Sequence, residues 1–348
     1  MARLDTLVEH LGRIVAAEGP PPPPAVAEEL AEVCAVLDNE SPEMRPRDEA
    51  GRPGGLVYLR PELPLVVVPD IHGRADLLVT VLSSSFPEYG IDRSLLAMID
   101  EDRAQLLMVG DYVHGEARAR DRWVHAFEEY LGGYRKHAAI DEEMRENLTV
   151  LRIVAAIKAA YPDRIHGLKG NHENITNENR DGNLPFGKFV YEGEMVAEYM
   201  GRYYDGAAYE AVYRFEKSLP LLAVAPRTLI SHAEPARLFE TDEVIDYRNR
   251  EEVVYGFTWT DNDAAEQGSV RRMLEHYLPQ VQPEDAIYLG GHRPVPELYR
   301  LRADGLYVQI HNPDRFIVAL PPTGRVFDPD RDVQELPRSE AIFHGEDR

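Results

Sequence analysis

The sequence is poor in cysteine and in long apolar runs. Its 348 residues hold one cysteine, Cys34, which cannot form an internal disulfide. No segment approaches the roughly 20 apolar residues that span a bilayer. Charged residues at Arg3, Asp5, Glu9 and Arg13 interrupt the N-terminal apolar positions, so the uninterrupted centre of a signal peptide is missing. We therefore expect a soluble, cytoplasmic protein with no membrane partner.

Basic residues are also scarce. The chain has 38 Lys and Arg against 61 Asp and Glu, a formal net charge of −23. Such a charge repels a phosphate backbone at long range, so no nucleic-acid groove is expected, although bound metal ions would reverse the sign locally. With 44% apolar residues, the chain is long enough to close one large core or two domains of ordinary size.

The N-terminal part has a helical pattern of its own. Apolar residues recur at helical spacing over residues 4–15, the prolines at 20–24 break the helix, and the pattern resumes at 26–37. Residues 39–55 are rich in Pro, Gly and charged side chains, as is typical of a surface connector. We predict a helical appendage and connector at 1–60, whose protein partner is unknown, and a catalytic domain at 61–348.

The rest of the chain alternates short apolar runs with polar loops and helical stretches, which favours an α/β fold. In open α/β sheets, ligands gather at the carboxyl ends of the strands, where these loops lie. The predicted strands are 65–68, 106–109, 164–168, 221–230, 286–289 and 306–310, and the main predicted helices are 74–85, 121–161 and 189–217.

Five of these loops carry side chains that bind metals. A single Asp or His at a strand end more often caps a turn or fills a polar site in the core. Several strand ends that each present such a residue, in one order, point instead to a metal centre. Mixed carboxylate, amide and imidazole ligands suit Mn, Fe or Zn. The candidates are Asp70 and His72, Asp111, Asn171, His232 and His292.

The ordered set resembles the calcineurin-like metallophosphoesterases, in particular the phosphoprotein-phosphatase branch. That branch reads GDxHG, GDxVDRG, GNHE, then HG and GH. The matching pieces here are Asp70 to Gly73, Gly110 to Val113, Gly170 to Glu173, Ser231-His232 and Gly291-His292, while Phe257 to Asp263 is similar to the branch's LWSDP stretch. The resemblance covers about residues 65–320.

This resemblance implies a four-layer α/β/β/α sandwich of two mixed sheets, with a helical insertion at about 118–147. It implies two divalent metal ions, with Asp70 and His72 on one, with Asn171, His232 and His292 on the other, and with the Asp111 carboxylate between them. Two such ions lower the pKa of a bridging water and neutralise charge on the phosphoryl oxygens. His172 would protonate the leaving group.

One departure from the pattern concerns catalysis. The branch has an Asp-Arg pair after the valine, where this chain has His114 and Gly115. His114 can hydrogen-bond to the acid His172 but brings no negative charge, and the arginine that grips the substrate phosphate is missing. Candidates for that guanidinium are Arg118, Arg120 and Arg293, against the alternative of ordinary surface arginines.

Two further features have competing interpretations. The insertion is either a cap over the site or, as we prefer, a solvated helical segment. His311 follows another strand run, either as an additional ligand or second-shell partner of the metals or as a strand-end polar cap.

The leading functional hypothesis is hydrolysis of phosphomonoesters, on small molecules or on phosphoserine and phosphothreonine in proteins. A dinucleoside-polyphosphate or nucleotide pyrophosphohydrolase would use the same six ligands. A third hypothesis, from another class, is a catalytically impaired metal-binding scaffold, which the missing Asp-Arg pair would explain.

Overall fold

Two mixed β-sheets form the centre of the molecule. The structure is a computed structural model that describes residues 2–338, so that residue 1 and residues 339–348 of the predicted catalytic domain lie outside it. The six-stranded sheet has the order β1-β5-β6-β7-β9-β8 and the five-stranded sheet β11-β10-β2-β3-β4. The strands are β1 (Leu56–Tyr58), β2 (Leu65–Val68), β3 (Gln105–Met108), β4 (Ile165–Gly167), β5 (Leu222–Ala225), β6 (Thr228–Ser231), β7 (Ile287–Gly290), β8 (Arg300–Arg302), β9 (Tyr307–Gln309), β10 (Ile317–Ala319) and β11 (Val333–Glu335).

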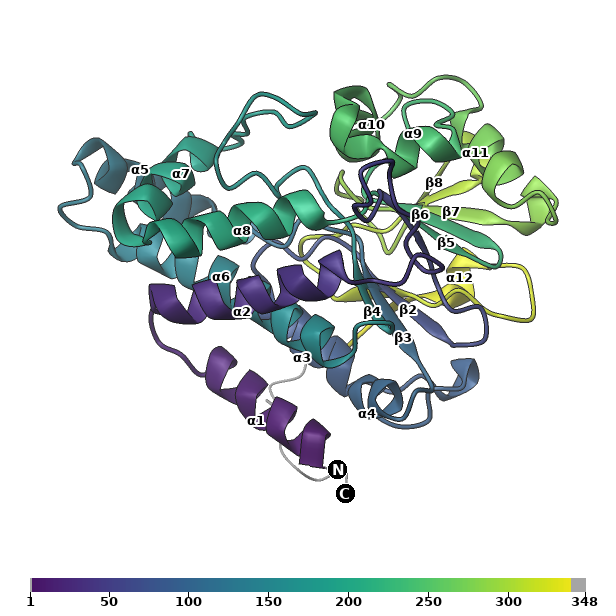
Figure 1. The fold of residues 1–348 in the computed structure, drawn as a ribbon, viewed down its shortest axis with the longest axis horizontal. Coiled ribbons are helices and arrows are strands. Elements are labelled where there is room, and N and C mark those ends of the chain that lie inside the picture. The colour runs from purple at the N-terminus through teal and green to yellow at the C-terminus, as the bar shows by residue number, and fades with distance from the viewer. Residues whose placement is uncertain (1, 339–348) are drawn as a thin grey trace.

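Twelve α-helices among the described residues cover these sheets (Figure 1). In Figure 1, α9 to α11 lie above the six-stranded sheet, α3 and α4 lie below the other sheet, and a group that includes α2 and α5 to α8 extends to the left. The helices are α1 (Ala2–Val15), α2 (Pro23–Asp38), α3 (Ala75–Ser83), α4 (Leu95–Asp100), α5 (Arg120–Leu131), α6 (Ala138–Ala160), α7 (Glu192–Tyr203), α8 (Gly206–Ser218), α9 (Thr241–Ile245), α10 (Glu251–Thr258), α11 (Ser269–Tyr277) and α12 (Pro329–Asp332).

The layer order follows from the two-residue period of the strands. Val67 of β2 faces a core shared with Ile230 of the other sheet, whereas Val66 and Val68 face the helices. Successive side chains of a strand point to opposite faces, so a run such as LVVV buries one face against the second sheet and the other against helices. The predicted four-layer sandwich is confirmed.

Some element boundaries differ from the sequence expectation. The apolar stretch 221–230 is a hairpin of β5 and β6 rather than one strand, because Pro226 and Arg227 turn the chain between them. The predicted helix 121–161 is two helices that are broken around Gly132, and 189–217 is also two, with the Asp205 carboxylate capping α8 at the amide of Ala208. The helical insertion predicted at 118–147 consists of α5 and the first half of α6, which continues beneath the core to Ala160.

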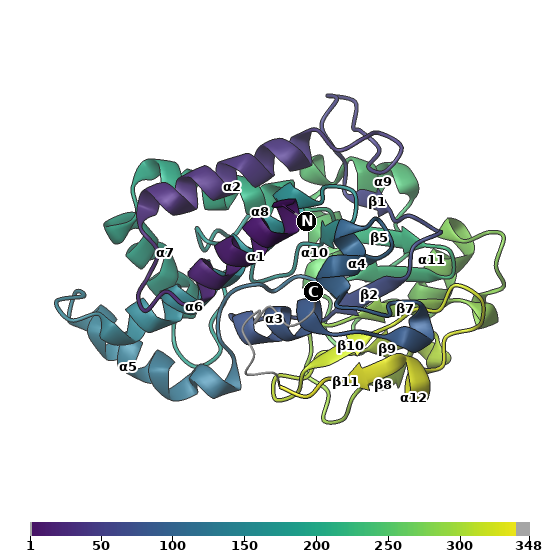
Figure 2. The same cartoon turned by 90° about the horizontal axis from the view of Figure 1, so that it is seen from below.

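The N-terminal helices pack on the body of the protein. Leu11 and Leu30 belong to the same buried cluster as Leu148 of α6 and Phe215 of α8, and Figure 2 shows α1 and α2 beside these helices. Strand β1, from the connector region, pairs in parallel with β5. None of the helices within residues 2–338 has the length and apolarity that crossing a bilayer requires.

Candidate metal centre

Six strands deliver the candidate residues to one place. Asp70 and His72 follow β2, Asp111 follows β3, and Asn171 with His172 follows β4; His232, His292 and His311 follow β6, β7 and β9 of the second sheet. The two sheets pack face to face, so the loops after these strands converge at one edge of the sandwich.

Hydrogen bonds to backbone fix the loops of the first sheet against one another. The Glu173 carboxylate accepts from the amides of Gly170, Asp111 and Tyr112 at 2.7, 2.8 and 2.9 Å. The amide of His72 donates to the carbonyl of Asp111 at 2.7 Å. These hydrogen bonds fix the loops after β2, β3 and β4 relative to one another, and the Glu173 carboxylate connects two of these loops.

Four site residues have a positive backbone φ angle, which is unfavourable for residues with a Cβ. The φ angles of His72, Asp111, His114 and His292 are 48°, 49°, 66° and 65°. This left-handed region costs a residue with a Cβ about 1–2 kcal/mol, and such strain gathers at functional sites. The surrounding contacts therefore hold these side chains in place against a local cost.

One group of ligand atoms centres on Asn171. Its Oδ1 lies 2.9 Å from His232 Nε2 and 2.9 Å from His292 Nδ1. Ligands about 2.1 Å from one ion at right angles lie about 3 Å apart, so these contacts match the edges of a coordination shell. Asn171, His232 and His292 are brought together as the sequence predicts.

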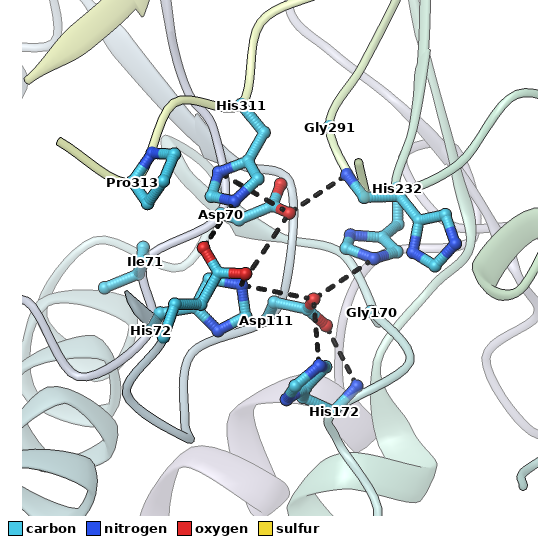
Figure 3. A network of polar contacts seen from close by, with 12 residues as sticks. Asp70, Ile71, His72, Asp111, Gly170, His172, His232, Gly291, His311 and Pro313 are labelled. Carbon is cyan, nitrogen blue, oxygen red and sulfur yellow. Dashed lines mark hydrogen bonds and ion pairs between the residues drawn. The ribbon is translucent and has the colours of Figure 1, made fainter. Parts of the chain in front are cut away.

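A second group centres on Asp70 and His72, and Asp111 joins the two groups. The Oδ2 of Asp111 lies 3.6 Å from His72 Nε2 and 3.4 Å from His232 Nε2, and the Oδ2 of Asp70 lies 3.9 Å from His72 Nε2 (Figure 3). Asp70, Asp111 and His232 are one potential metal-binding triad, and Asp70, His72 and His311 are another. The carboxylate of Asp111 stands between both groups.

The electrostatics of the site call for a cation. Burial and the charge of Glu116 raise the pKa of Asp70, although His311 opposes this, and burial with the charge of Asp70 raises the pKa of Asp111. Burial lowers the pKa of His72 to about 4, which leaves its imidazole neutral and able to act as a ligand. Buried carboxylates beside neutral imidazoles are stabilised by a metal ion.

The packing of the loops also fits a metal cradle. The Oδ1 of Asp70 is buried and has no hydrogen-bond partner within residues 2–338. A Cβ on Gly291 would collide with Asp70, and one on Gly170 would collide with Asp111. Small residues thus keep space beside both carboxylates, and one oxygen of Asp70 is left without a partner. The donor set fits the divalent ions Mn, Fe or Zn.

His172 and His114 lie beside the ligands as predicted. Their Nδ1 atoms are 3.2 Å apart, and the Nε2 of His172 lies 3.9 Å from Asp111 Oδ2. The Phe186 ring packs on both, with centroid distances of 4.2 and 4.5 Å. Burial, followed by the charges of His72 and His114, lowers the pKa of His172. The side chain of His172 is 13% exposed and that of Asp111 1%, so His172 is the more open to solvent.

Two of the three candidate arginines, Arg118 and Arg293, already pair with carboxylates. Arg118 donates to the carbonyl of His72 at 3.1 Å and pairs with Glu146 at 2.7 Å. It lines a cavity of about 310 Å³ behind the His72 loop, with Arg74. Arg293 pairs with Asp261, in the segment similar to LWSDP, at 2.8 Å and is 42% exposed.

Two charged residues of the site were not singled out from the sequence. Glu116 is buried, and its Oε1 lies 3.8 Å from His72 Nε2 and 2.9 Å from the ammonium of Lys188. Glu116 stands two residues after His114 in the loop that departs from the phosphatase pattern, which is the one signal that would have pointed to it. Lys188 lies in a loop without a motif.

Among known proteins, similarity to this chain was found in structure and not in sequence. No family model and no curated protein sequence matches the chain. A protein serine/threonine phosphatase from Saccharomyces cerevisiae, described as similar to human phosphatase PP5, aligns with a TM-score of 0.55 and 14% identity over 92% of this chain and 91% of its own. A cold-active protein-tyrosine phosphatase of Shewanella aligns over 81% of this chain and 82% of its own, with a TM-score of 0.45 and 15% identity.

Proposed function

From the fold that it shares with a protein serine/threonine phosphatase, we propose that this chain is a metal-dependent phosphoesterase that hydrolyses phosphomonoesters at a dinuclear site. The observation that carries the proposal is the position of Asp111, whose Oδ2 lies 3.6 Å from His72 and 3.4 Å from His232. A carboxylate has two anionic oxygens and can join two ions, as catalysis by two metals requires.

The residues divide into two sets around Asp111. Asp70 and His72 would hold one ion, and Asn171, His232 and His292 the other. When bound, two such ions supply a nucleophilic hydroxide and neutralise charge on the phosphoryl oxygens.

Proton transfer is assigned to His172. His114, 3.2 Å away, orients its ring, and Phe186 covers both rings from one side. Burial keeps the imidazole of His172 neutral, and a phosphoryl group beside it supplies the negative charge that favours the protonated form. His172 then gives its proton to the departing alcohol.

Substrate binding and location complete the proposal. Arg293, exposed and next to the ligand His292, would bind the phosphate after exchanging its partner Asp261. Arg118 is bound to the carbonyl of His72 and to Glu146, so it would act on the substrate only if it left both. The substrates are phosphorylated small molecules or proteins, and the single buried cysteine is compatible with a cytoplasmic location.

The test is metal content together with hydrolysis of p-nitrophenyl phosphate, with and without added Mn, in the wild type and in Asp111→Asn. The wild type should bind two ions per chain and turn over, and Asp111→Asn should lose one ion and fall in activity by at least about 10²-fold, since an amide brings one neutral acceptor. Asp92 is exposed, so the variant Asp92→Asn serves as a control that should match the wild type in metal content and activity. No bound metal in the wild type after Mn addition would contradict the proposal.

Substrate class is decided by a second assay. Rates on a phosphoserine peptide and on diadenosine tetraphosphate, measured side by side, separate a phosphatase from a nucleotide pyrophosphohydrolase. We expect the phosphomonoester to be the faster substrate. Bound metal without turnover on either substrate would instead support the scaffold hypothesis.

A further inference from the structure

We propose that His311 is an additional ligand of the metal held by Asp70 and His72, and that Glu116 positions the His311 ring for this role. The inference rests on the proposed dinuclear site and adds two residues to it. Neither is supplied by the resemblance on which the six predicted ligands were based, although Glu116 lies in the same loop as Asp111 and His114.

The geometry brings His311 to the right place. The side chain of His311 is fully buried, and its Nδ1 lies 3.7 Å from the Oδ2 of Asp70. The rings of His311 and His72 lie 5.3 Å apart, centroid to centroid. One donor atom from each of Asp70, His72 and His311 fits within 4.8 Å of the others, a spacing at which one ion can contact all three (Figure 3).

Glu116 fixes which ring nitrogen of His311 faces the site. The Nε2 of His311 lies 2.8 Å from Glu116 Oε2, so the hydrogen on this nitrogen is directed at the carboxylate. In the neutral ring that would bind a metal, Nδ1 carries the lone pair and faces Asp70. A carboxylate that holds one nitrogen of an imidazole while the other binds a metal is a recurrent arrangement, in which the carboxylate sets the tautomer and raises the basicity of the ligand.

The Nδ1 atom of His311 makes no hydrogen bond within the described residues. It is buried, and the 3.7 Å to Asp70 exceeds hydrogen-bond length. A polar cap of the strand end would require the ring to bond to backbone, but Nε2 bonds to Glu116. The backbone carbonyl of His311 already accepts from the amide of Val295 at 2.8 Å. The strand-end cap therefore does not account for this side chain.

Glu116 is in turn held in place from outside. Lys188, 48% exposed, donates to its Oε1 at 2.9 Å. Lys188, Glu116 and His311 thus form a row of contacts from solvent to the proposed metal position. His311 would give the ion at Asp70 an imidazole ligand from the second sheet, so that each ion would be held by residues of both sheets.

The experiment measures metal binding rather than activity. Mn affinity and stoichiometry by titration calorimetry, with the thermal midpoint in EDTA and in Mn, are compared for the wild type, His311→Ala and Glu116→Gln. His311→Ala should keep one tight site and lose the other. Glu116→Gln should weaken one site by about 10–100-fold. In both variants Mn should raise the thermal midpoint by less than it does in the wild type. A purely structural role would lower the midpoint in EDTA and in Mn alike, so the rise caused by Mn would stay the same.

The control is His166→Ala on β4, another buried histidine. The charged groups around it are Lys158, Glu40 and Asp163 rather than the proposed ligands, so this variant should leave both Mn sites intact. Two Mn ions bound to His311→Ala with wild-type affinity would overturn the inference while leaving the Asp111 site standing. A wild type without metal would remove the proposed function itself. If His311→Ala does not fold, Glu116→Gln decides, because it keeps the shape of the side chain and alters only its charge and its hydrogen bond.

Discussion

At the level of single residues, the position of His172 fits a role different from that of the proposed ligands. It is next to Asn171 in sequence, yet its ring stands beside His114 and Phe186, and its backbone amide, at 2.9 Å, donates to the Oδ1 of Asp111. Removal of its ring therefore leaves the carboxylates and the other imidazoles in place.

His172→Ala should keep two metal ions and lose turnover on poor leaving groups. Hydrolysis of phenyl phosphate, whose alcohol needs a proton, should fall about 10²–10⁴-fold, the usual contribution of a general acid. Hydrolysis of p-nitrophenyl phosphate should fall much less, since its leaving group departs as an anion. Steady-state kinetics on both esters test this, and equal losses would remove the acid role from His172.

Gly291 is a residue whose missing side chain matters. A Cβ there would collide with the Oδ1 of Asp70, an oxygen of the proposed metal centre, so Gly291→Ala should displace Asp70 and weaken metal binding. Gly201→Ala in α7 is the matched control, because nothing lies within 4 Å of its added methyl group. The control should be neutral or gain about 0.5–1 kcal/mol of stability from its helix position. Metal content and thermal midpoint report both effects.

At the level of elements, the strand ends were the most predictable part of the sequence. Each of β2, β3 and β4 is a short apolar run that leads into a polar loop, and their residues were located to within a residue or two. Four of the six three-residue strands, β1, β8, β10 and β11, were missed, whereas β4 and β9 were found. A segment of three residues is too short to display a two-residue period by itself. The turn inside 221–230 was hidden because both strands of the hairpin are apolar.

The N-terminal helices are a test case for domain structure, and their separation at residue 60 remains a prediction. Leu30 of α2 is fully buried in the cluster that includes α6 and α8, while Glu28 of the same helix is exposed. Leu30→Ala should cost about 2–5 kcal/mol from lost burial and a cavity, and Glu28→Ala almost nothing. If the helices fold with the body, thermal unfolding of Leu30→Ala shows one transition with a lower midpoint. A separate early transition would make them an independent unit.

At the level of the whole molecule, a buried ion group ties the connector after α2 to α6. Glu40 pairs with Lys158 at 2.6 Å and with Arg45 at 2.9 Å. Burial alone would raise the pKa of Glu40, but the charges of Lys158 and Arg45 outweigh it and lower this pKa to about 2. Because the folded-state pKa lies below the ordinary value, the ionised form stabilises the fold.

The Glu40 contribution should therefore depend on pH in a defined direction. It is fully present above the ordinary carboxyl pKa of about 4.5 and is lost as pH falls toward 2, by about 3 kcal/mol in total. Urea unfolding of wild type and Glu40→Gln should show a stability gap at pH 6 that narrows at pH 3. A gap that stayed constant over this range would contradict the assigned pKa.

The sequence by itself determined the residue types and their order at the strand ends, because burial of both sheet faces demands unbroken apolar runs and the loops that follow are free to carry polar side chains. It indicated Asp70, His72, Asp111, Asn171, His232 and His292 by their order at the strand ends, and His172 through the resemblance. Only the tertiary structure decided what stands beside them. Glu116 directly follows the second motif, Lys188 comes from a segment without a motif, and the sequence left two interpretations of His311 open. Their side chains meet because the two sheets pack face to face. Contacts between such distant segments leave no local pattern in the sequence.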